Sequence, residues 1–132
     1  MTRGFQTRSL HAGTDPDPAT GSRATPIHQT TSYVFEDADT TAEMYALRAD
    51  GHIYSRLSNP TVAALEDRIA DLEGGSDAVA TGSGMAAIDA ITTVLASAGD
   101  NVVAAAEMYG GTSTYFTTIA DRRGVEARLV DT

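Results

Sequence analysis

Residues 78–95, AVATGSGMAAIDAITTVL, hold a short apolar run, a glycine-rich turn and an amphipathic segment in immediate succession. The apolar run at 78–81 predicts a short β-strand. The segment at about 85–97 predicts a helix, because its apolar residues recur every three or four positions. The Gly-Ser-Gly turn at 82–84 therefore joins the carboxyl end of a strand to the amino end of a helix.

Strands and helices alternate on both sides of this turn. A helix is predicted upstream, because Asn59 followed by proline is a start signal and Gly74 can end a helix in the left-handed conformation. Downstream, a continuous apolar run predicts a buried strand at 101–106, followed by a helix at 112–123 and a strand at 125–130. The order, a helix and then βαβαβ, predicts an α/β fold with a parallel sheet and helical crossovers.

Residues 1–58 carry no sustained helical or strand period and read as an extended arm with turns. One short helix is predicted at 40–48, after two acidic residues. A segment of this length is too long for an ordinary loop, and its aromatic content predicts packing, which we expect to be against another subunit. We therefore predict two parts: an arm at 1–58 that makes inter-subunit contacts, and the first part of a larger α/β domain at 59–132.

The composition excludes several classes of function. The chain has 18 acidic and nine basic residues, a net charge of −9, and its basic residues are all arginine. This balance disfavours nucleic acid and anionic membrane surfaces as partners. The absence of cysteine excludes disulfides and thiolate catalysis. With no long apolar run, a cytoplasmic location is expected. An acidic, lysine-free chain suits a high-salt environment and a GC-rich genome equally well.

The candidate site lies where the predicted strands end, since ligands of parallel sheets bind beyond the carboxyl ends of the strands. The Gly82-Ser83-Gly84-Met85 turn leads into a helix N-terminus, where unpaired backbone N–H groups favour an anion such as phosphate. A tight turn without a ligand accounts for the same residues. Tyr109, in a glycine-rich loop after the next strand, can stack on a planar ligand, although a plain loop tyrosine is the simpler interpretation.

Tyr54 and Arg56 are two apart, and in an extended segment their side chains would point the same way. A phenol and a guanidinium together suit a phosphate, while a surface pair without function is the simpler interpretation. The three histidines of the arm lack the spacing of metal ligands, so no metal site is predicted. Charged residues on the predicted helices, Asp71 and Arg123 among them, are interpreted as solvated.

A dinucleotide site is an alternative. Gly82, Gly84 and Ala87 fit the G-x-G-x-x-A pattern, and Glu107 ends the following strand at about the required distance. This interpretation leaves the residues before Asn59 without a purpose.

Three segments occur together and in order: YSRLSNPT at 54–61, GSGMAA at 82–87 and YGGT at 109–112. In this combination the chain resembles the Cys/Met-metabolism family of pyridoxal-phosphate enzymes, of fold-type I. Three segments of the arm are most similar to the O-acetylhomoserine sulfhydrylase branch: HAG at 11–13, DPDPATG at 15–21 and PIHQTTSYVF at 26–35. The resemblance covers essentially the whole chain and corresponds to the N-terminal part of such an enzyme.

The resemblance implies pyridoxal 5'-phosphate as cofactor, bound by Tyr54, Arg56, Ser83, Gly84, Met85 and Tyr109. The first two would reach the cofactor phosphate of a neighbouring subunit, and the next three would hold the phosphate of their own. The tyrosine at 109 would stack on the ring and move protons, which makes it the one implied catalytic residue. The branch often has Gln in place of Met85, a change that a backbone donor tolerates. The family's cofactor-bonding lysine lies further along and is not in this chain.

The implied reaction belongs to methionine biosynthesis. O-acetylhomoserine and sulfide or methanethiol would give homocysteine or methionine and acetate by γ-replacement. The implied partners are this amino-acid substrate and further copies of the chain, in a homodimer or homotetramer with shared active sites. The chain alone is expected to be inactive. Cystathionine γ-synthase, cystathionine γ-lyase and methionine γ-lyase activities remain alternatives within the family.

Overall fold

The computed structural model describes residues 3–131. The chain forms two compact units, one up to Ala80 and one from Thr81 onward. The first unit contains three helices: α1 (Phe5–His11), α2 (Ala38–Tyr45) and α3 (Pro60–Glu73). The second contains α4 (Gly84–Leu95), β1 (Asn101–Ala105), α5 (Gly110–Thr114), the π-helix η1 (Tyr115–Ala120) and β2 (Glu126–Val130).

Helix α3 begins and ends as predicted. The Asn59 side chain accepts a hydrogen bond from the N–H of Thr61 (2.9 Å), and Pro60 occupies the first turn. Gly74 ends the helix with φ 71°, in the left-handed region. Local capping chemistry therefore sets both ends of this helix.

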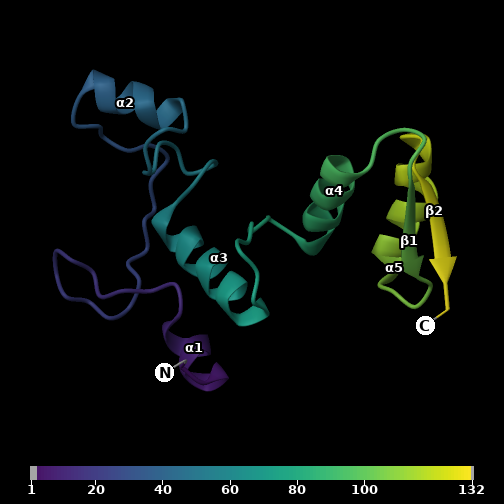
Figure 1. Ribbon diagram of the computed structural model, residues 1–132, viewed down its shortest axis with the longest axis horizontal. Helices are drawn as coiled ribbons and strands as arrows, with labels where there is room; N and C mark the ends of the chain where they lie inside the picture. Colours follow the sequence, from purple (N-terminus) through teal and green to yellow (C-terminus); the bar gives the residue numbers. More distant parts are fainter. Residues whose placement is uncertain (1–2, 132) are drawn as a thin grey trace. The chain divides into compact units, whose positions relative to one another are not determined.

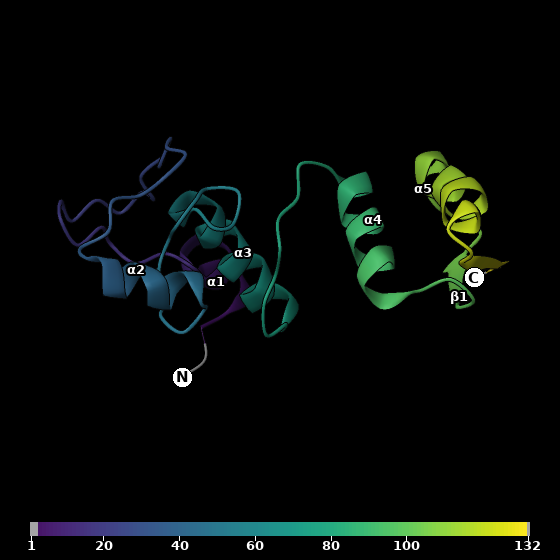
Figure 2. The same cartoon turned by 90° about the horizontal axis from the view of Figure 1, so that it is seen from above.

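The arm contains more helix than its sequence pattern predicts. Helix α1 was not anticipated; it packs beside α3 in both views (Figures 1 and 2). Asp71 is exposed, as predicted for a solvated helix face, and its carboxylate also lies 2.7 Å from Arg8 Nε. Helix α2 confirms the short helix expected at 40–48 but begins earlier, because Asp37 caps it by accepting from the N–H of Thr40 (2.6 Å). It also ends earlier, before Leu47, whose φ is 57°.

The second unit confirms the parallel crossover. Strands β1 and β2 run parallel, with Asn101 opposite Glu126 and Ala105 opposite Val130. The helical segment α5–η1 connects them and packs on one face of the two-stranded sheet (Figures 1 and 2). The buried core consists of Tyr115, Phe116, Ala120 and Val125. The helix predicted at 112–123 is present, but it begins at Gly110 and passes through a π-helical stretch.

The strand predicted at 78–81 does not form, so the structure has two of the three expected strands. These residues belong to no helix or strand, Val79 is 83% exposed, and the N–H of Ala80 donates to a Glu66 carboxylate oxygen (2.7 Å). A β-strand requires a second strand to take its hydrogen bonds, and the described residues provide none here. The α/β class is unaffected, because the other two strands and their crossover are in place.

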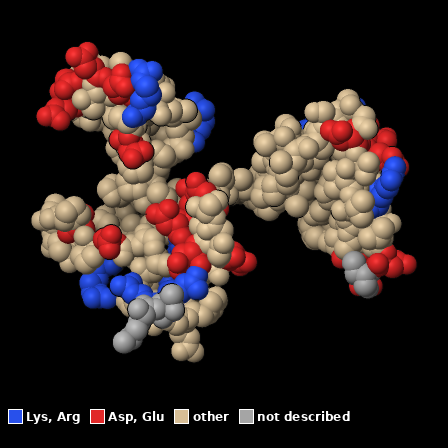
Figure 3. Space-filling model, viewed as in Figure 1, with Lys and Arg blue, Asp and Glu red and all other residues tan. Residues whose placement is uncertain are grey.

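The surface reflects the acidic composition. On the face drawn in Figure 3, acidic side chains are spread over both units, while much of α4 is uncharged. Ile91, Val94 and Leu95 of α4 are exposed. Among residues 3–131, no helix is both long enough and apolar enough to span a membrane.

Candidate functional site

The turn before α4 leaves two backbone donors free. Ser83 caps the helix: its Oγ accepts from the N–H of Ala86 (3.1 Å), and its carbonyl accepts from the N–H of Ala87 (3.1 Å). Within the described part of the chain, the N–H groups of Gly84 and Met85 have no acceptor. Unpaired N–H groups at a helix N-terminus are the groups that bind an anion.

The space around this turn is open. A Cβ atom built on Gly82 or Gly84 would meet no other atom within 4 Å. The described residues therefore leave the space beside these two glycines unfilled. A phosphate-sized group can approach the backbone closely, as the sequence predicted for a glycine-rich turn.

Tyr109 lies at the N-terminus of α5 with its side chain 75% exposed. Its carbonyl accepts hydrogen bonds from the N–H groups of Thr112 (2.9 Å) and Ser113 (3.0 Å), which starts the helix. The ring lies over Gly111: a Cβ atom at that position would be only 2.6 Å from Tyr109 Cε1. Glycine at 111 therefore makes room for the ring, a role that the sequence pattern did not reveal.

The glycine-rich turn and the start of α5 meet within the second unit. The Thr112 hydroxyl lies 3.7 Å from the sulfur of Met85, close enough for a weak hydrogen bond. The structure thus brings the GSGM and YGGT segments together, as expected for the carboxyl ends of neighbouring elements in a parallel fold.

Tyr54 and Arg56 lie together, but not for the predicted reason. The carbonyl of Tyr54 accepts from the N–H groups of Leu57 (2.8 Å) and Ser58 (3.1 Å), so this segment is a turn and the prediction of an extended segment is wrong. The Arg56 guanidinium nevertheless lies 5.5 Å from the centroid of the Tyr54 ring. Within residues 3–131 Arg56 forms no ion pair, so its charge is available to a ligand.

A hydrogen-bonded network supports this turn, and sequence reasoning missed it. Asn59 is buried, with 7% exposure, and its Nδ2 donates to the carbonyl of His28 (2.9 Å) and to Ser55 Oγ (3.0 Å). His52 Nδ1 lies 3.0 Å from Ser58 Oγ, which supports a structural role for this histidine. The Asn-Pro pair signalled only the helix cap, because the other partners lie far away in the sequence.

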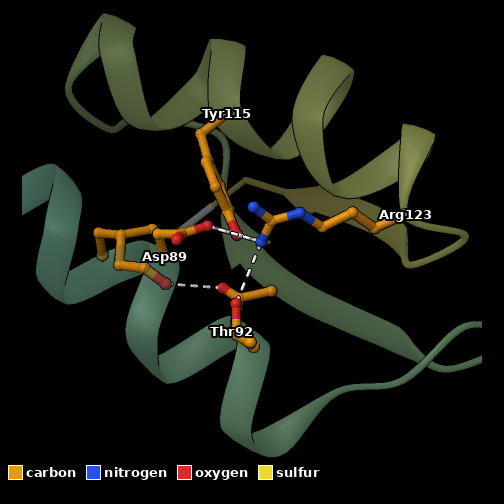
Figure 4. Close-up of polar contacts among 6 residues, drawn as sticks. Asp89, Thr92, Tyr115 and Arg123 are labelled. Atoms are coloured by element: carbon orange, nitrogen blue, oxygen red, sulfur yellow. Dashed lines mark hydrogen bonds and ion pairs between the residues drawn. The ribbon is translucent and has the colours of Figure 1, made fainter.

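A second network joins α4 to η1 (Figure 4). Asp89 Oδ1 accepts from the Tyr115 hydroxyl (3.0 Å) and from Arg123 Nη1 (2.6 Å), and Arg123 Nη1 also donates to Thr93 Oγ1 (3.1 Å). The hydrogen bond from Tyr115, followed by that from Arg123, lowers the pKa of Asp89 below its ordinary value. Arg123 is exposed, as predicted for a solvated residue, and it also links α4 to Tyr115 through its hydrogen bonds.

The described residues contain no group of three or more His, Asp or Glu side chains that could hold a metal ion. The candidate groups are Tyr54 and Arg56 in the first unit, and the backbone donors of the α4 N-terminus with Tyr109 in the second. Such a set suits a phosphate attached to a planar aromatic group.

Residues 6–132 match the family described as Cys/Met metabolism PLP-dependent enzyme. The chain belongs to this family.

Relatives of this Cys/Met-metabolism chain include sulfhydrylases and homocysteine synthases. It is 51% identical over 125 residues to O-acetyl-L-homoserine sulfhydrylase 1 of Thermus thermophilus, covering 95% of this chain and 30% of that protein. It is 48% identical over 127 residues to the homocysteine synthase of Schizosaccharomyces pombe, covering 96% of this chain and 30% of that protein. The chain thus spans about 30% of the length of the curated relatives it matches, which agrees with the expected N-terminal part of a longer enzyme.

Solved structures agree with this assignment. A Campylobacter jejuni protein described as an O-acetylhomoserine (thiol)-lyase, which carries an N'-pyridoxyl-lysine-5'-monophosphate group, matches with a TM-score of 0.92 and 41% identity. The match covers 98% of this chain and 32% of that one. The cystathionine gamma-lyase of Lactobacillus plantarum, complexed with L-serine, matches with a TM-score of 0.84 and 32% identity, covering 98% of this chain and 31% of that one.

The residues present fit the cofactor of this PLP-dependent family. The α4 N-terminus offers two unpaired N–H groups beside open space, and Arg56 offers a positive charge without a carboxylate partner in the described residues. Tyr109 offers an exposed aromatic face. These are the groups that the phosphate and ring of pyridoxal phosphate require.

Proposed function

We propose that this chain forms the phosphate- and ring-binding part of an enzyme that converts O-acetylhomoserine and sulfide, or methanethiol, into homocysteine, or methionine, with release of acetate. The observation that carries the proposal is the 51% identity over 125 residues with the O-acetyl-L-homoserine sulfhydrylase 1 of Thermus thermophilus. The free donors at the α4 N-terminus support it, because they match the anionic end of the cofactor.

In this proposal each residue has a distinct task. The N–H groups of Gly84 and Met85 donate to the phosphate at the positive end of α4, in a turn that Ser83 caps. The Arg56 guanidinium and the Tyr54 hydroxyl contact the phosphate of a neighbouring subunit. The cofactor, when bound, supplies an electron sink for charge that develops on the substrate.

Tyr109 has the two remaining tasks. Its exposed ring stacks on the cofactor, and its phenol oxygen gives or takes a proton close to the substrate. The only hydrogen-bonding group on its ring is the hydroxyl, so proton transfer would occur at that atom.

The assembly and domain boundary are part of the same proposal. Because Tyr54 and Arg56 would act on a neighbour, the enzyme would be a homodimer or homotetramer with shared active sites. The arm at 1–58 would make the contacts between subunits, and residues 59–132 would begin the large domain. We also propose a cytoplasmic location, as expected for an enzyme of amino-acid biosynthesis.

The test uses protein expressed from the full reading frame that contains this chain. With pyridoxal phosphate bound, it should release acetate and form homocysteine from O-acetylhomoserine and sulfide. Cystathionine formed with cysteine, in the absence of turnover with sulfide or methanethiol, would reject the proposal. That result would favour a cystathionine γ-synthase instead. Cleavage of cystathionine without turnover of O-acetylhomoserine would favour a γ-lyase, an alternative supported by the likeness to the Lactobacillus plantarum lyase.

The chain of 132 residues contains no lysine. By itself it should be inactive and should form no borohydride-reducible adduct with pyridoxal phosphate on any side chain. Detection of a side-chain adduct by mass spectrometry would contradict this expectation.

A further inference from the structure

Asn59 uses every hydrogen-bonding group of its amide inside the first unit. Its Oδ1 accepts from the N–H of Thr61 (2.9 Å), while its Nδ2 donates to the carbonyl of His28 (2.9 Å) and to Ser55 Oγ (3.0 Å). The side chain is 7% exposed, so no solvent molecule can readily replace these partners. One amide therefore joins the start of α3, the arm and the turn at 54–58.

We propose that Asn59 is a positioning residue that holds Tyr54 and Arg56 in the arrangement that binds phosphate. The inference rests on the proposed function, since it assigns to Asn59 the support of a site proposed there. It adds a residue outside the phosphate contacts themselves.

The connection runs through Ser55, which lies between the two phosphate-binding residues in the chain. Ser55 Oγ accepts from Asn59 and donates to the carbonyl of Thr30, and the N–H of Ser55 donates to the carbonyl of Thr31 (2.9 Å). These bonds fix the backbone of the turn on the arm segment.

Tyr54 and Arg56 need this support because their own side chains are not held by a packed core. Tyr54 is 39% exposed, and Arg56 is exposed as well. Their positions therefore follow the backbone of the turn. Among the residues that cap helices well, only asparagine offers an acceptor and two N–H donors on one short side chain. Helix capping alone does not require it.

The decisive variant is Asn59→Ser. Serine caps a helix as well as asparagine does, so α3 keeps its cap, but both amide donors are lost. Dissociation constants for pyridoxal 5'-phosphate and for pyridoxal, which lacks the phosphate, are measured on apoprotein from the full reading frame. We expect pyridoxal phosphate to bind about tenfold more weakly and pyridoxal to change by less than about twofold, the size of effect given by one or two lost hydrogen bonds. The ³¹P resonance of the bound phosphate should shift as well.

Two further variants make the outcome decisive. Ser55→Ala leaves the Asn59 cap intact and removes the link to the turn. It should therefore lower the ratio of the pyridoxal dissociation constant to the pyridoxal phosphate dissociation constant, even if Asn59→Ser does not fold. Asn101→Ser, in β1, is the matched control and should leave the ratio unchanged.

The outcomes separate the two proposals. If wild-type protein does not prefer pyridoxal phosphate over pyridoxal, or Arg56→Ala does not reduce that preference, the proposed phosphate site fails. If Arg56→Ala reduces the preference but Ser55→Ala does not, the role of Asn59 is overturned while the phosphate site stands. Equal weakening of both ligands, together with a lower melting temperature, would also overturn it, because it would show a purely structural role.

Discussion

Replacement of Gly111 by alanine should move the ring of Tyr109 without harming the fold. An alanine Cβ would lie 2.6 Å from Tyr109 Cε1 and 3.2 Å from Cδ1. Nonbonded carbon atoms keep a separation of about 3.5 Å or more, so the near edge of the ring must move by roughly 1 Å. The clash is with a flexible side chain, and rotation of the ring can relieve it.

The expected cost is therefore in activity rather than in stability. A misplacement of about 1 Å in a group that acts on the substrate can lower the rate by about 100-fold. Alanine should leave the free energy of unfolding unchanged or raise it by about 0.5–1 kcal/mol, since glycine is the poorer residue in a helix. The assay is kcat/KM for O-acetylhomoserine and sulfide, together with thermal unfolding, on protein from the full reading frame.

Gly110 provides the matched control. It lies in the same first turn of α5, and a Cβ atom there would meet nothing within 4 Å. Gly110→Ala should therefore share the change in stability and keep wild-type kcat/KM. If Gly111→Ala is as active as Gly110→Ala, the position of the Tyr109 ring does not matter for the reaction, and the assigned role of this tyrosine is wrong.

Other predictions address the fold. Phe116→Ala, at a core position 8% exposed, should lower the free energy of unfolding by about 3 kcal/mol in chemical denaturation. Phe5→Ala, at a position 65% exposed, should cost less than about 0.5 kcal/mol, and equal losses would contradict the assigned core. The lowered pKa of Asp89 means that its contribution to stability is present above its unfolded pKa and is lost as the pH falls through the folded value. Asp89→Asn should therefore flatten the acid decline of the melting temperature; a decline as steep as in wild type would argue against the network. Gly74→Ala forces φ 71° on a residue with a side chain and should cost about 1 kcal/mol, whereas Gly75→Ala should cost less.

The sequence by itself determined the features that depend on neighbouring residues. Asn59 and Gly74 mark the ends of α3 because a cap and a left-handed residue act within one turn of the helix. The same holds for Ser83 at the start of α4. The apolar pattern also predicted β1, β2 and the crossover between them. Local chemistry was sufficient for each of these.

Only the tertiary structure decided which distant residues meet. The strand expected at 78–81 lacks a partner in the described chain, and an apolar run cannot form a strand without one. The sequence correctly predicted that the side chains of Tyr54 and Arg56 lie together. It predicted the wrong backbone conformation, since a turn rather than an extended segment brings them together.

The contacts of Asn59 and Gly111, which support the proposed site, could not be predicted from the sequence either. Asn59 reaches the carbonyl of His28, and Gly111 accommodates the Tyr109 ring. The first contact depends on how the arm folds back on α3, and the second on a side-chain orientation at the start of α5. Spacing along a chain records helix and strand periods, but it does not record which segments close on one another or where a ring comes to rest. For this protein the sequence therefore predicted the groups that we propose as ligand contacts, and the folded chain revealed what holds them in place.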